Sequence, residues 1–165
     1  MLWQVFLPAC AVGCVFHFLY VSLGEPRLLR WLLPISESPW EHFKLVFWPL
    51  GGGLAVAVWL TDATAGAWVC AWAVAAGHGF CTMMGIYFFY RGALGVTQPL
   101  LWVDISNYFI TMFCGWVLGL RALAYRPGWE AVLPAALALA ACAISLGLFS
   151  EVPPAEPLFR EERRK

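Results

Sequence analysis

Five long apolar segments constrain the fold of this 165-residue chain more than any other feature. A helix that crosses a bilayer needs about 20 mostly apolar residues, and each segment reaches that length. With 62% hydrophobic and 12% charged residues, the chain carries more apolar surface than one soluble domain could bury. We therefore predict an all-α, multi-pass membrane protein. The expected spans are residues 2–23, 39–60, 66–90, 100–122 and 130–150.

The domain organisation follows from the same pattern. Residues 1–150 are expected to form one transmembrane bundle, and residues 151–165 a charged, disordered cytoplasmic tail rich in proline. The first apolar segment has no preceding Lys or Arg and no cleavage site, which indicates a retained helix and not a signal peptide. The six cysteines lie inside expected helices without a C-x-x-C pair, so they are interpreted as apolar packing residues. The zero net charge and scattered cations argue against nucleic acid as a partner.

The distribution of Lys and Arg predicts the orientation in the membrane, because short loops rich in these residues stay cytoplasmic. The first connection contains Arg27 and Arg30, the third contains Arg91, the second contains neither residue type, and the tail ends in several cations. Arg121 and Arg126, near the fourth connection, favour the opposite orientation. The balance predicts a protein of a bacterial inner membrane with its N-terminus outside and its C-terminus in the cytoplasm.

The segment 36–44 is the densest polar cluster, with two carboxylates, an imidazole and an ammonium in nine residues. Part of it has a local explanation. Ser38 as N-cap and Glu41 three residues later form a capping box, and Glu41 with Lys44 makes an i, i+3 ion pair. Glu37 and His42 have no such explanation, which favours a functional role for them.

Two further helices are expected to bring polar groups to the same depth. His17 and Tyr20 share a face near the cytoplasmic end of the first helix. Asp104 lies about five residues into the fourth helix, roughly 7 Å below the interface at 1.5 Å per residue. An acidic group costs about 2.5 to 3.5 kcal/mol at the centre of a membrane helix and less near the interface. Asp104 therefore needs a partner or a wet cavity. The inward face of that helix is expected to contain Asp104, Asn107, Tyr108, Thr111, Gly115 and Gly119.

These residues suit several kinds of chemistry. His17, His42 and Asp104 supply nitrogen and oxygen ligands for zinc or a similar divalent ion, although no fixed-spacing motif such as H-E-x-x-H is present. The same groups would also serve as a proton relay, or as a lipid-headgroup site that uses Lys44 and the adjacent helix N-terminus. A Ser-His-Asp triad or a haem site through paired histidines is less well supported. The candidate catalytic residues are His17, Glu37, Glu41, His42 and Asp104, and the candidate substrate-binding or headgroup-binding residues are Tyr20, Lys44 and Asn107.

The sequence at these positions resembles a family of small, uncharacterised bacterial integral membrane proteins. The resemblance is in His17-Phe18-x-Tyr20, in Ser36-Glu37-Ser38-x-Trp40-Glu41-His42-x-Lys44-Leu45, and in Asp104-Ile105. Family members usually have Asn where this chain has Ser36, and Glu-Trp-Ser-Gly where it has residues 21–24, so an acid is missing there. His78 is outside the pattern. The resemblance implies a shared polar site and carries no known reaction.

Three functions remain open at this stage. The first is an enzyme that acts on a lipid or isoprenoid-like substrate. The second is a small transporter or transporter subunit, suggested by the expected kink at residues 49–53 and by the buried Asp104. The third is a non-catalytic membrane partner protein. Membrane lipid is the expected partner in each case, and a homo-oligomer or a membrane partner protein is compatible with all three.

Overall fold

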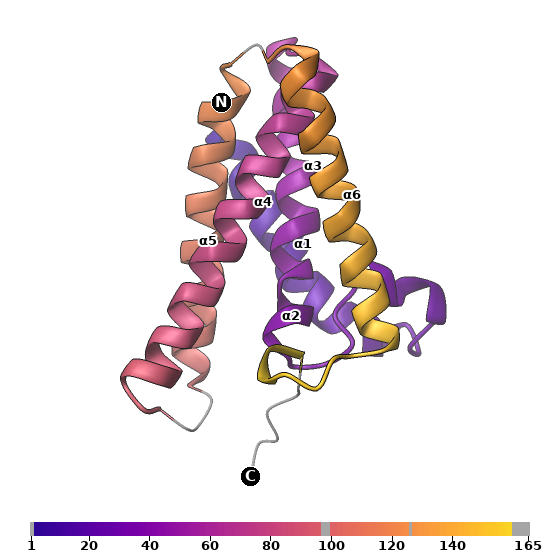
Figure 1. The fold of residues 1–165 in the computed structure, drawn as a ribbon, viewed down its shortest axis with the longest axis vertical. Coiled ribbons are helices and arrows are strands. Elements are labelled where there is room, and N and C mark those ends of the chain that lie inside the picture. The colour runs from indigo at the N-terminus through magenta and orange to yellow at the C-terminus, as the bar shows by residue number, and fades with distance from the viewer. Residues whose placement is uncertain (1, 97–99, 126, 160–165) are drawn as a thin grey trace.

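The five predicted spans are helices in the computed structural model, which describes residues 2–96, 100–125 and 127–159. Within these residues, the helices that are long and apolar enough to cross a membrane cover Trp3–Ser22, Pro39–Thr61, Ala65–Ala93, Leu101–Leu123 and Trp129–Glu151. Each boundary agrees with the sequence prediction to within about three residues. The helices run up and down, so the N- and C-termini lie at opposite ends of the bundle (Figure 1). The fold is an all-α membrane bundle.

The chain also forms short elements at the end of the bundle that holds the C-terminus (Figure 1). A 3-10 turn, η1, follows the first helix; the second span is divided into α2 and α3; a π-helical turn, η2, ends the third span; and a 3-10 turn, η3, follows the last helix. The elements are α1 (Trp3–Ser22), η1 (Arg27–Trp31), α2 (Pro39–His42), α3 (Lys44–Thr61), α4 (Ala65–Phe88), η2 (Phe89–Ala93), α5 (Leu101–Leu123), α6 (Trp129–Glu151) and η3 (Pro157–Phe159).

The second span is the centre of the bundle. Its most apolar stretch is 61% buried within the protein, against 17–33% for the other four spans. Phe47, Leu50 and Leu54 on α3 have no exposed surface, and Trp116 on α5 is equally buried. Helices α1, α4 and α5 therefore pack around α3, and their outer faces remain available to lipid.

Small residues on α5 allow a close approach of α4, as the G-x-x-x-G spacing predicts. A Cβ atom at Gly115 would lie 3.0 Å from the carbonyl oxygen of Ala75, and one at Gly119 would lie 3.1 Å from the Cβ of the same alanine. The inward face predicted for this helix is confirmed, since Asn107, Thr111 and both glycines are buried.

The sequence predicts a kink at residues 49–53. The second span instead departs from regular α-helix at Phe43, between α2 and α3. Helix α3 continues through Pro49, and two indoles of α4 donate to carbonyls close to it. Trp72 Nε1 lies 3.0 Å from the oxygen of Phe47, and Trp68 Nε1 lies 2.9 Å from the oxygen of Gly51. Gly51 is needed for this contact, because a Cβ there would lie 2.4 Å from the Trp72 ring.

The described part of the C-terminal segment packs back onto the bundle. The ring centre of Phe159 in η3 lies 5.1 Å from that of Trp40, in a tilted arrangement, and 5.1 Å from that of Phe149, edge to face, so the chain as far as this residue is held against α2 and α6. Residues 160–165, the rest of the expected disordered tail, lie outside the described residues, as does Arg126. On the other side of α6, the ring of Trp31 in η1 covers Gly147.

Candidate functional site

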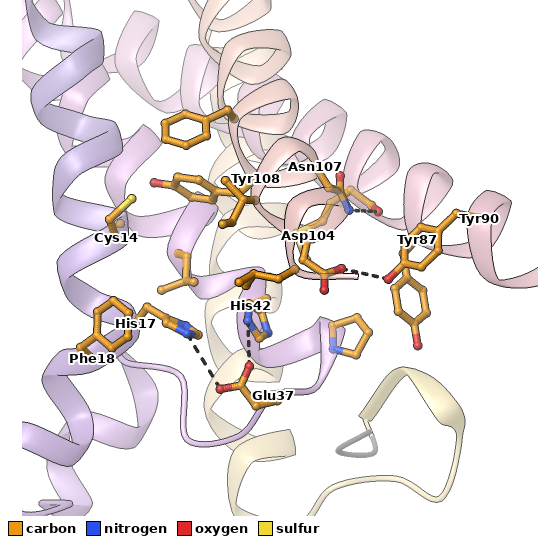
Figure 2. Close-up of a pocket in the computed structure, with 17 residues that line it drawn as sticks. Cys14, His17, Phe18, Glu37, His42, Tyr87, Tyr90, Asp104, Asn107 and Tyr108 are labelled. Carbon is orange, nitrogen blue, oxygen red and sulfur yellow. Dashed lines mark hydrogen bonds and ion pairs between the residues drawn. The ribbon is translucent and has the colours of Figure 1, made fainter. Parts of the chain in front are cut away.

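A pocket of about 370 Å³ opens between α1, α2, α4 and α5 at the end of the bundle that holds the C-terminus (Figure 2). Its walls are mostly apolar and aromatic, with polar groups at two places. One group lies where α1 meets the segment before α2, and the other lies on α5 and η2. The polar and ionisable lining residues are Cys14, His17, Glu37, His42, Tyr87, Tyr90, Asp104, Asn107 and Tyr108.

His17, Glu37 and His42 converge on one point of this pocket. Glu37 Oε2 lies 3.5 Å from His42 Nε2, and Glu37 Oε1 lies 3.9 Å from His17 Nε2. One ligand atom from each residue falls within 4.8 Å of the other two. The two histidine side chains are 28% and 30% exposed and that of Glu37 is 47% exposed, so the group lies at the mouth of the pocket. Figure 2 shows the Glu37 carboxylate between the two rings.

The backbone of α2 fixes the orientation of His42. Its Nδ1 lies 3.0 Å from the carbonyl oxygen of Ser38, which can only accept a hydrogen bond. Nδ1 must therefore carry the proton, and the lone pair of a neutral ring is left on Nε2, which faces Glu37. A backbone carbonyl that holds the second ring nitrogen in this way is a common support for a metal-binding histidine. Ser38 in turn caps α2, with its Oγ 3.3 Å from the amide nitrogen of Glu41.

The spacing of the three side chains is close to that of a divalent metal site. Tetrahedral zinc with ligand bonds of about 2.0 to 2.2 Å separates neighbouring ligand atoms by about 3.3 to 3.6 Å. The distance from Glu37 Oε2 to His42 Nε2, 3.5 Å, is within this range, whereas Glu37 Oε1 lies 3.9 Å from His17 Nε2. One ligand atom from each of the three residues lies within 4.8 Å of the others, so the side chains would have to move closer together to hold an ion. A divalent ion held by two imidazoles and a carboxylate would keep a further position for water or substrate.

Asp104 lies across the pocket from the histidines, on α5. The hydroxyl of Tyr90 in η2 donates to Asp104 Oδ1 at 2.9 Å. Deeper along the same helix, Asn107 Nδ2 donates to the oxygen of Met83 at 3.1 Å, which joins α5 to α4. Tyr108 spans the gap to α1, where its hydroxyl donates to the oxygen of Cys10 at 2.8 Å. These residues form the second polar wall and the inner end of the pocket.

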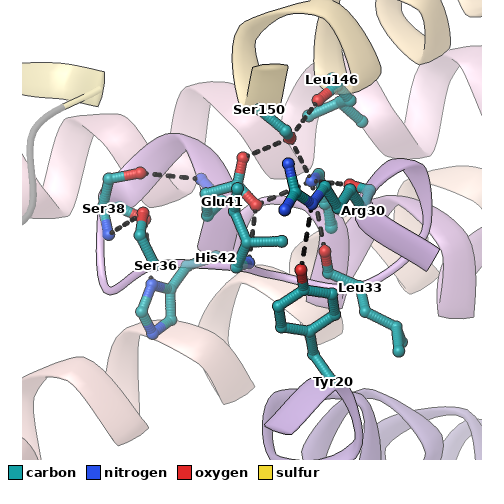
Figure 3. Close-up of polar contacts among 11 residues, drawn as sticks. Tyr20, Arg30, Leu33, Ser36, Ser38, Glu41, His42, Leu146 and Ser150 are labelled. Atoms are coloured by element: carbon teal, nitrogen blue, oxygen red, sulfur yellow. Dashed lines mark hydrogen bonds and ion pairs between the residues drawn. The ribbon is translucent and has the colours of Figure 1, made fainter. Parts of the chain in front are cut away.

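Glu41 and Lys44 are not among the residues that line the pocket; they belong to a buried network between α2, α3, η1 and α6, in which Figure 3 shows Glu41 beside Ser150. Glu41 is 3% exposed and Lys44 is fully buried, with Lys44 Nζ 2.7 Å from Glu41 Oε2. The ammonium also donates to Ser150 Oγ and to the carbonyls of Arg30 and Leu33. Ser150 Oγ lies 2.6 Å from Glu41 Oε1, and the amide of Ile35 donates to Glu41 Oε2 at 2.9 Å. We call Glu41, Lys44 and Ser150 the buried clamp.

Tyr20 also lies outside the pocket. Its hydroxyl accepts from Arg30 Nε at 3.1 Å and donates to the oxygen of Glu25 at 3.3 Å, which ties α1 to the loop that follows it. The hydrogen bond that Arg30 donates to Tyr20 raises the pKa of the Arg30 guanidinium further above its already high value, so Arg30 stays charged. Arg30 also pairs with Glu151 at 3.4 Å at the protein surface.

The structure thus divides the candidate residues into two sets. His17, Glu37, His42, Asp104 and Asn107 line one pocket, whereas Tyr20, Glu41 and Lys44 are held elsewhere. Within the pocket, Glu37 completes the group with the two histidines, and Asp104 bonds to Tyr90 instead. Because Lys44 is fully buried, it does not extend to lipid phosphates.

Sequence reasoning missed Tyr90 and Ser150, and it gave His78 little weight. Neither Tyr90 nor Ser150 has a local sequence signal, since Tyr90 finds its partner on the next helix and Ser150 finds its partners more than 100 residues earlier. His78 is exposed on the outer face of α4 and bonds only within its own helix, with Nδ1 3.1 Å from the oxygen of Val74. It is not one of the residues that line the pocket.

A model of a family of unknown function (DUF6512) matches residues 3–164, and the chain belongs to this family. No curated protein and no solved structure matches the chain. The membership agrees with the resemblance drawn from the sequence motifs and brings no assigned reaction with it.

Proposed function

We propose that this member of a family of unknown function is a metal-dependent membrane hydrolase that acts on a membrane amphiphile. The observation that carries the proposal is the convergence of His17, Glu37 and His42 at the mouth of a largely apolar pocket within a transmembrane bundle. Two imidazoles and a carboxylate that converge from α1, α2 and the loop between them favour a shared ligand, because local capping and ion pairing do not account for them.

A divalent ion such as zinc fits these donors best. His17 Nε2, His42 Nε2 and a Glu37 oxygen would hold it, and the open position would hold a water molecule whose pKa the metal lowers toward 7. The chemistry that such an ion would supply is hydrolysis: the oxygen of an activated water would bond to the electrophilic atom of the substrate, the bond from that atom to the leaving oxygen would break, and one water proton would pass to the leaving oxygen. Hydrolysis of this kind needs no oxidant or reductant.

We place the pocket on the cytoplasmic side of a bacterial inner membrane. Arg27, Arg30 and Arg91 belong to the first and third connections, at the end of the bundle where the pocket opens. Arg121, in the last turn of α5, belongs to the opposite end. The rule that positively charged short loops stay cytoplasmic therefore supports a cytoplasmic site and a cytoplasmic C-terminus.

Metal content and affinity test the proposal directly. Purified protein in detergent, stripped with chelator and titrated with Zn²⁺, is expected to bind one equivalent. His17→Ala, His42→Ala and Glu37→Gln are expected to lower the affinity at least about 100-fold, because each removes a ligand. His78→Ala is the matched control, since this exposed histidine lies outside the pocket.

Co²⁺ in place of Zn²⁺ supplies a second readout through its visible absorption, which reports four-coordinate geometry. Circular dichroism of each variant shows whether the helices persist. The proposal fails if folded wild-type protein binds no stoichiometric metal. It fails equally if His78→Ala weakens binding as much as the three pocket variants do.

A further inference from the structure

The pocket carries a second inference, which rests on the proposed function and specifies its substrate. We propose that the substrate is an amphiphile with an uncharged or cationic headgroup that bears a hydroxyl or amine. It enters sideways from the membrane between α1 and α5, and its headgroup donates a hydrogen bond to Asp104.

The rim of the pocket faces the lipid. Phe18 on α1 and Ile105 and Phe109 on α5 all line the pocket, yet they are 67%, 49% and 45% exposed on the flank of the bundle. Apolar side chains that are exposed on the outer surface of a transmembrane helix contact the acyl chains of the lipid. The rim is thus continuous with the hydrocarbon region, and an acyl chain can lie against it while the headgroup turns inward.

The inner end of the opening is closed by a contact between the same two helices. The hydroxyl of Tyr108 reaches the oxygen of Cys10 on α1, and Gly13 leaves the room for it, because a Cβ there would lie 2.1 Å from that hydroxyl. Entry between α1 and α5 is therefore restricted to the part of the pocket beside His17 and Asp104. A ligand that enters here reaches the two polar walls before it reaches the bundle core.

The charged residues that line the pocket give it no excess of positive charge that would attract an anion. Among the described residues that line it, the groups that carry full charge are the carboxylates of Glu37 and Asp104, and none is Lys or Arg. A divalent ion at the three ligands would bring the sum to zero. The cation beside this wall is Arg91, in η2, whose guanidinium packs on the rings of Tyr87 and Tyr90 and donates to the oxygen of Val96 at 3.1 Å. Because Arg91 is not one of the residues that line the pocket, the lining itself offers no Lys or Arg to a phosphate and favours uncharged or cationic headgroups.

The Asp104 carboxylate can accept a hydrogen bond from a hydroxyl or ammonium group of the ligand. Its Oδ1 accepts the Tyr90 hydroxyl, and no described residue donates to its Oδ2. A carboxylate has about four acceptor sites, so the side chain in the pocket retains capacity for a ligand hydroxyl or ammonium. The side chain lies across the pocket from His17, Glu37 and His42, so a substrate held by it would lie between the two polar walls (Figure 2).

The test compares two lipids that share their acyl chains and differ in headgroup charge. Full-length protein in phosphatidylcholine nanodiscs, loaded with Zn²⁺, is titrated with a fluorescent diacylglycerol probe, which is then displaced by unlabelled dioleoylglycerol or dioleoyl phosphatidic acid. We expect dioleoylglycerol to displace the probe at a concentration at least tenfold lower. Equal or better displacement by phosphatidic acid would overturn the assignment of headgroup charge.

Two variants with matched controls test the residues. Asp104→Asn is expected to weaken probe binding about tenfold with Zn²⁺ affinity unchanged, whereas Asp62→Asn, at the opposite end of the bundle, has no effect. Ile105→Trp is expected to weaken binding at least fivefold by filling the rim, whereas Ile110→Trp, at a similarly exposed position outside the pocket, does not. Unchanged probe binding in Asp104→Asn or in Ile105→Trp refutes the inference. If the folded wild-type protein binds no stoichiometric Zn²⁺, the proposed function is refuted, and this outcome is distinct from failure of the substrate inference.

Discussion

Removal of the Lys44 ammonium is the most demanding test of the packing described above. In Lys44→Met the side chain keeps a similar length and stays apolar, while the buried clamp loses its cation. Glu41, which is 3% exposed, is left without its ion-pair partner at 2.7 Å. The carbonyls of Arg30 and Leu33 lose the donor that they share.

The expected loss of stability follows from these contacts. Removal of one partner of a buried ion pair costs about 3 to 5 kcal/mol, because the remaining charge stays desolvated. Glu41 keeps hydrogen bonds from the Ile35 amide and the Ser150 hydroxyl, which reduces the penalty, whereas the unpaired carbonyls add to it. We expect Lys44→Met to lower the free energy of unfolding by about 4 kcal/mol.

A double-mutant cycle identifies the cause of this loss. Glu41→Gln removes the charge and keeps an acceptor for the Ile35 amide, so the pair Lys44→Met/Glu41→Gln no longer contains a lone buried charge. Its destabilisation is expected to be smaller than the sum of the two single changes by at least about 2 kcal/mol. Glu151→Gln, which removes the exposed ion pair with Arg30, is the control and should cost less than about 1 kcal/mol.

Unfolding is measured in mixed micelles by titration with a denaturing detergent and followed by Trp fluorescence. The reasoning would be refuted if Lys44→Met cost no more than Glu151→Gln, or if the effects of Lys44→Met and Glu41→Gln were additive. Either result would mean that the ammonium is hydrated and does not hold the loop carbonyls.

Two further predictions concern the α1 contact and the orientation. Gly13→Ala is expected to cost about 1 to 3 kcal/mol in the same unfolding assay, since its Cβ would lie 2.6 Å from the backbone oxygen of Leu45, which cannot move aside. Gly52→Ala, with open space around the new methyl group, should cost nothing or stabilise the helix slightly, and equal effects of the two changes would contradict the packing. For the orientation, Asp62→Cys in a background without the native cysteines should react with an impermeant maleimide added outside intact cells, whereas Glu156→Cys should react only after lysis. The reverse pattern would place the pocket on the outer side.

The spans could be predicted from the sequence because a bilayer imposes a length and a polarity on each helix, and both are local properties. The cap at Ser38 and the close approach at Gly115 and Gly119 are local in the same sense. Rotation about a helix axis relative to its neighbours is not local. Glu41 shows the difference: the capping motif accounts for its backbone amide, yet its carboxylate bonds to Lys44 and to Ser150 on a helix more than 100 residues later.

The membership of the candidate site was only partly accessible for the same reason. Grouping by depth brought His17, His42 and Asp104 together, and all three do line one pocket. Depth does not determine which side chains meet across that pocket. Glu37 reaches the histidines because the loop before α2 returns toward α1, and Asp104 bonds to Tyr90 because η2 carries that ring to α5.

The segment 36–44 serves both the pocket and the buried clamp, because its side chains point in different directions. Glu37, in the loop before α2, and His42, on α2, line the pocket, while Glu41 on α2 and Lys44 on α3 bond to Ser150 of α6. The Ser38 carbonyl that orients His42 belongs to the same helical turn that Ser38 Oγ caps through the Glu41 amide. Substitutions that disturb the clamp are therefore expected to displace His42 as well, because both depend on this turn. The density of charge in this segment thus reflects two adjacent roles: Glu41 and Lys44 bond within the buried clamp, and Glu37 and His42 line the pocket.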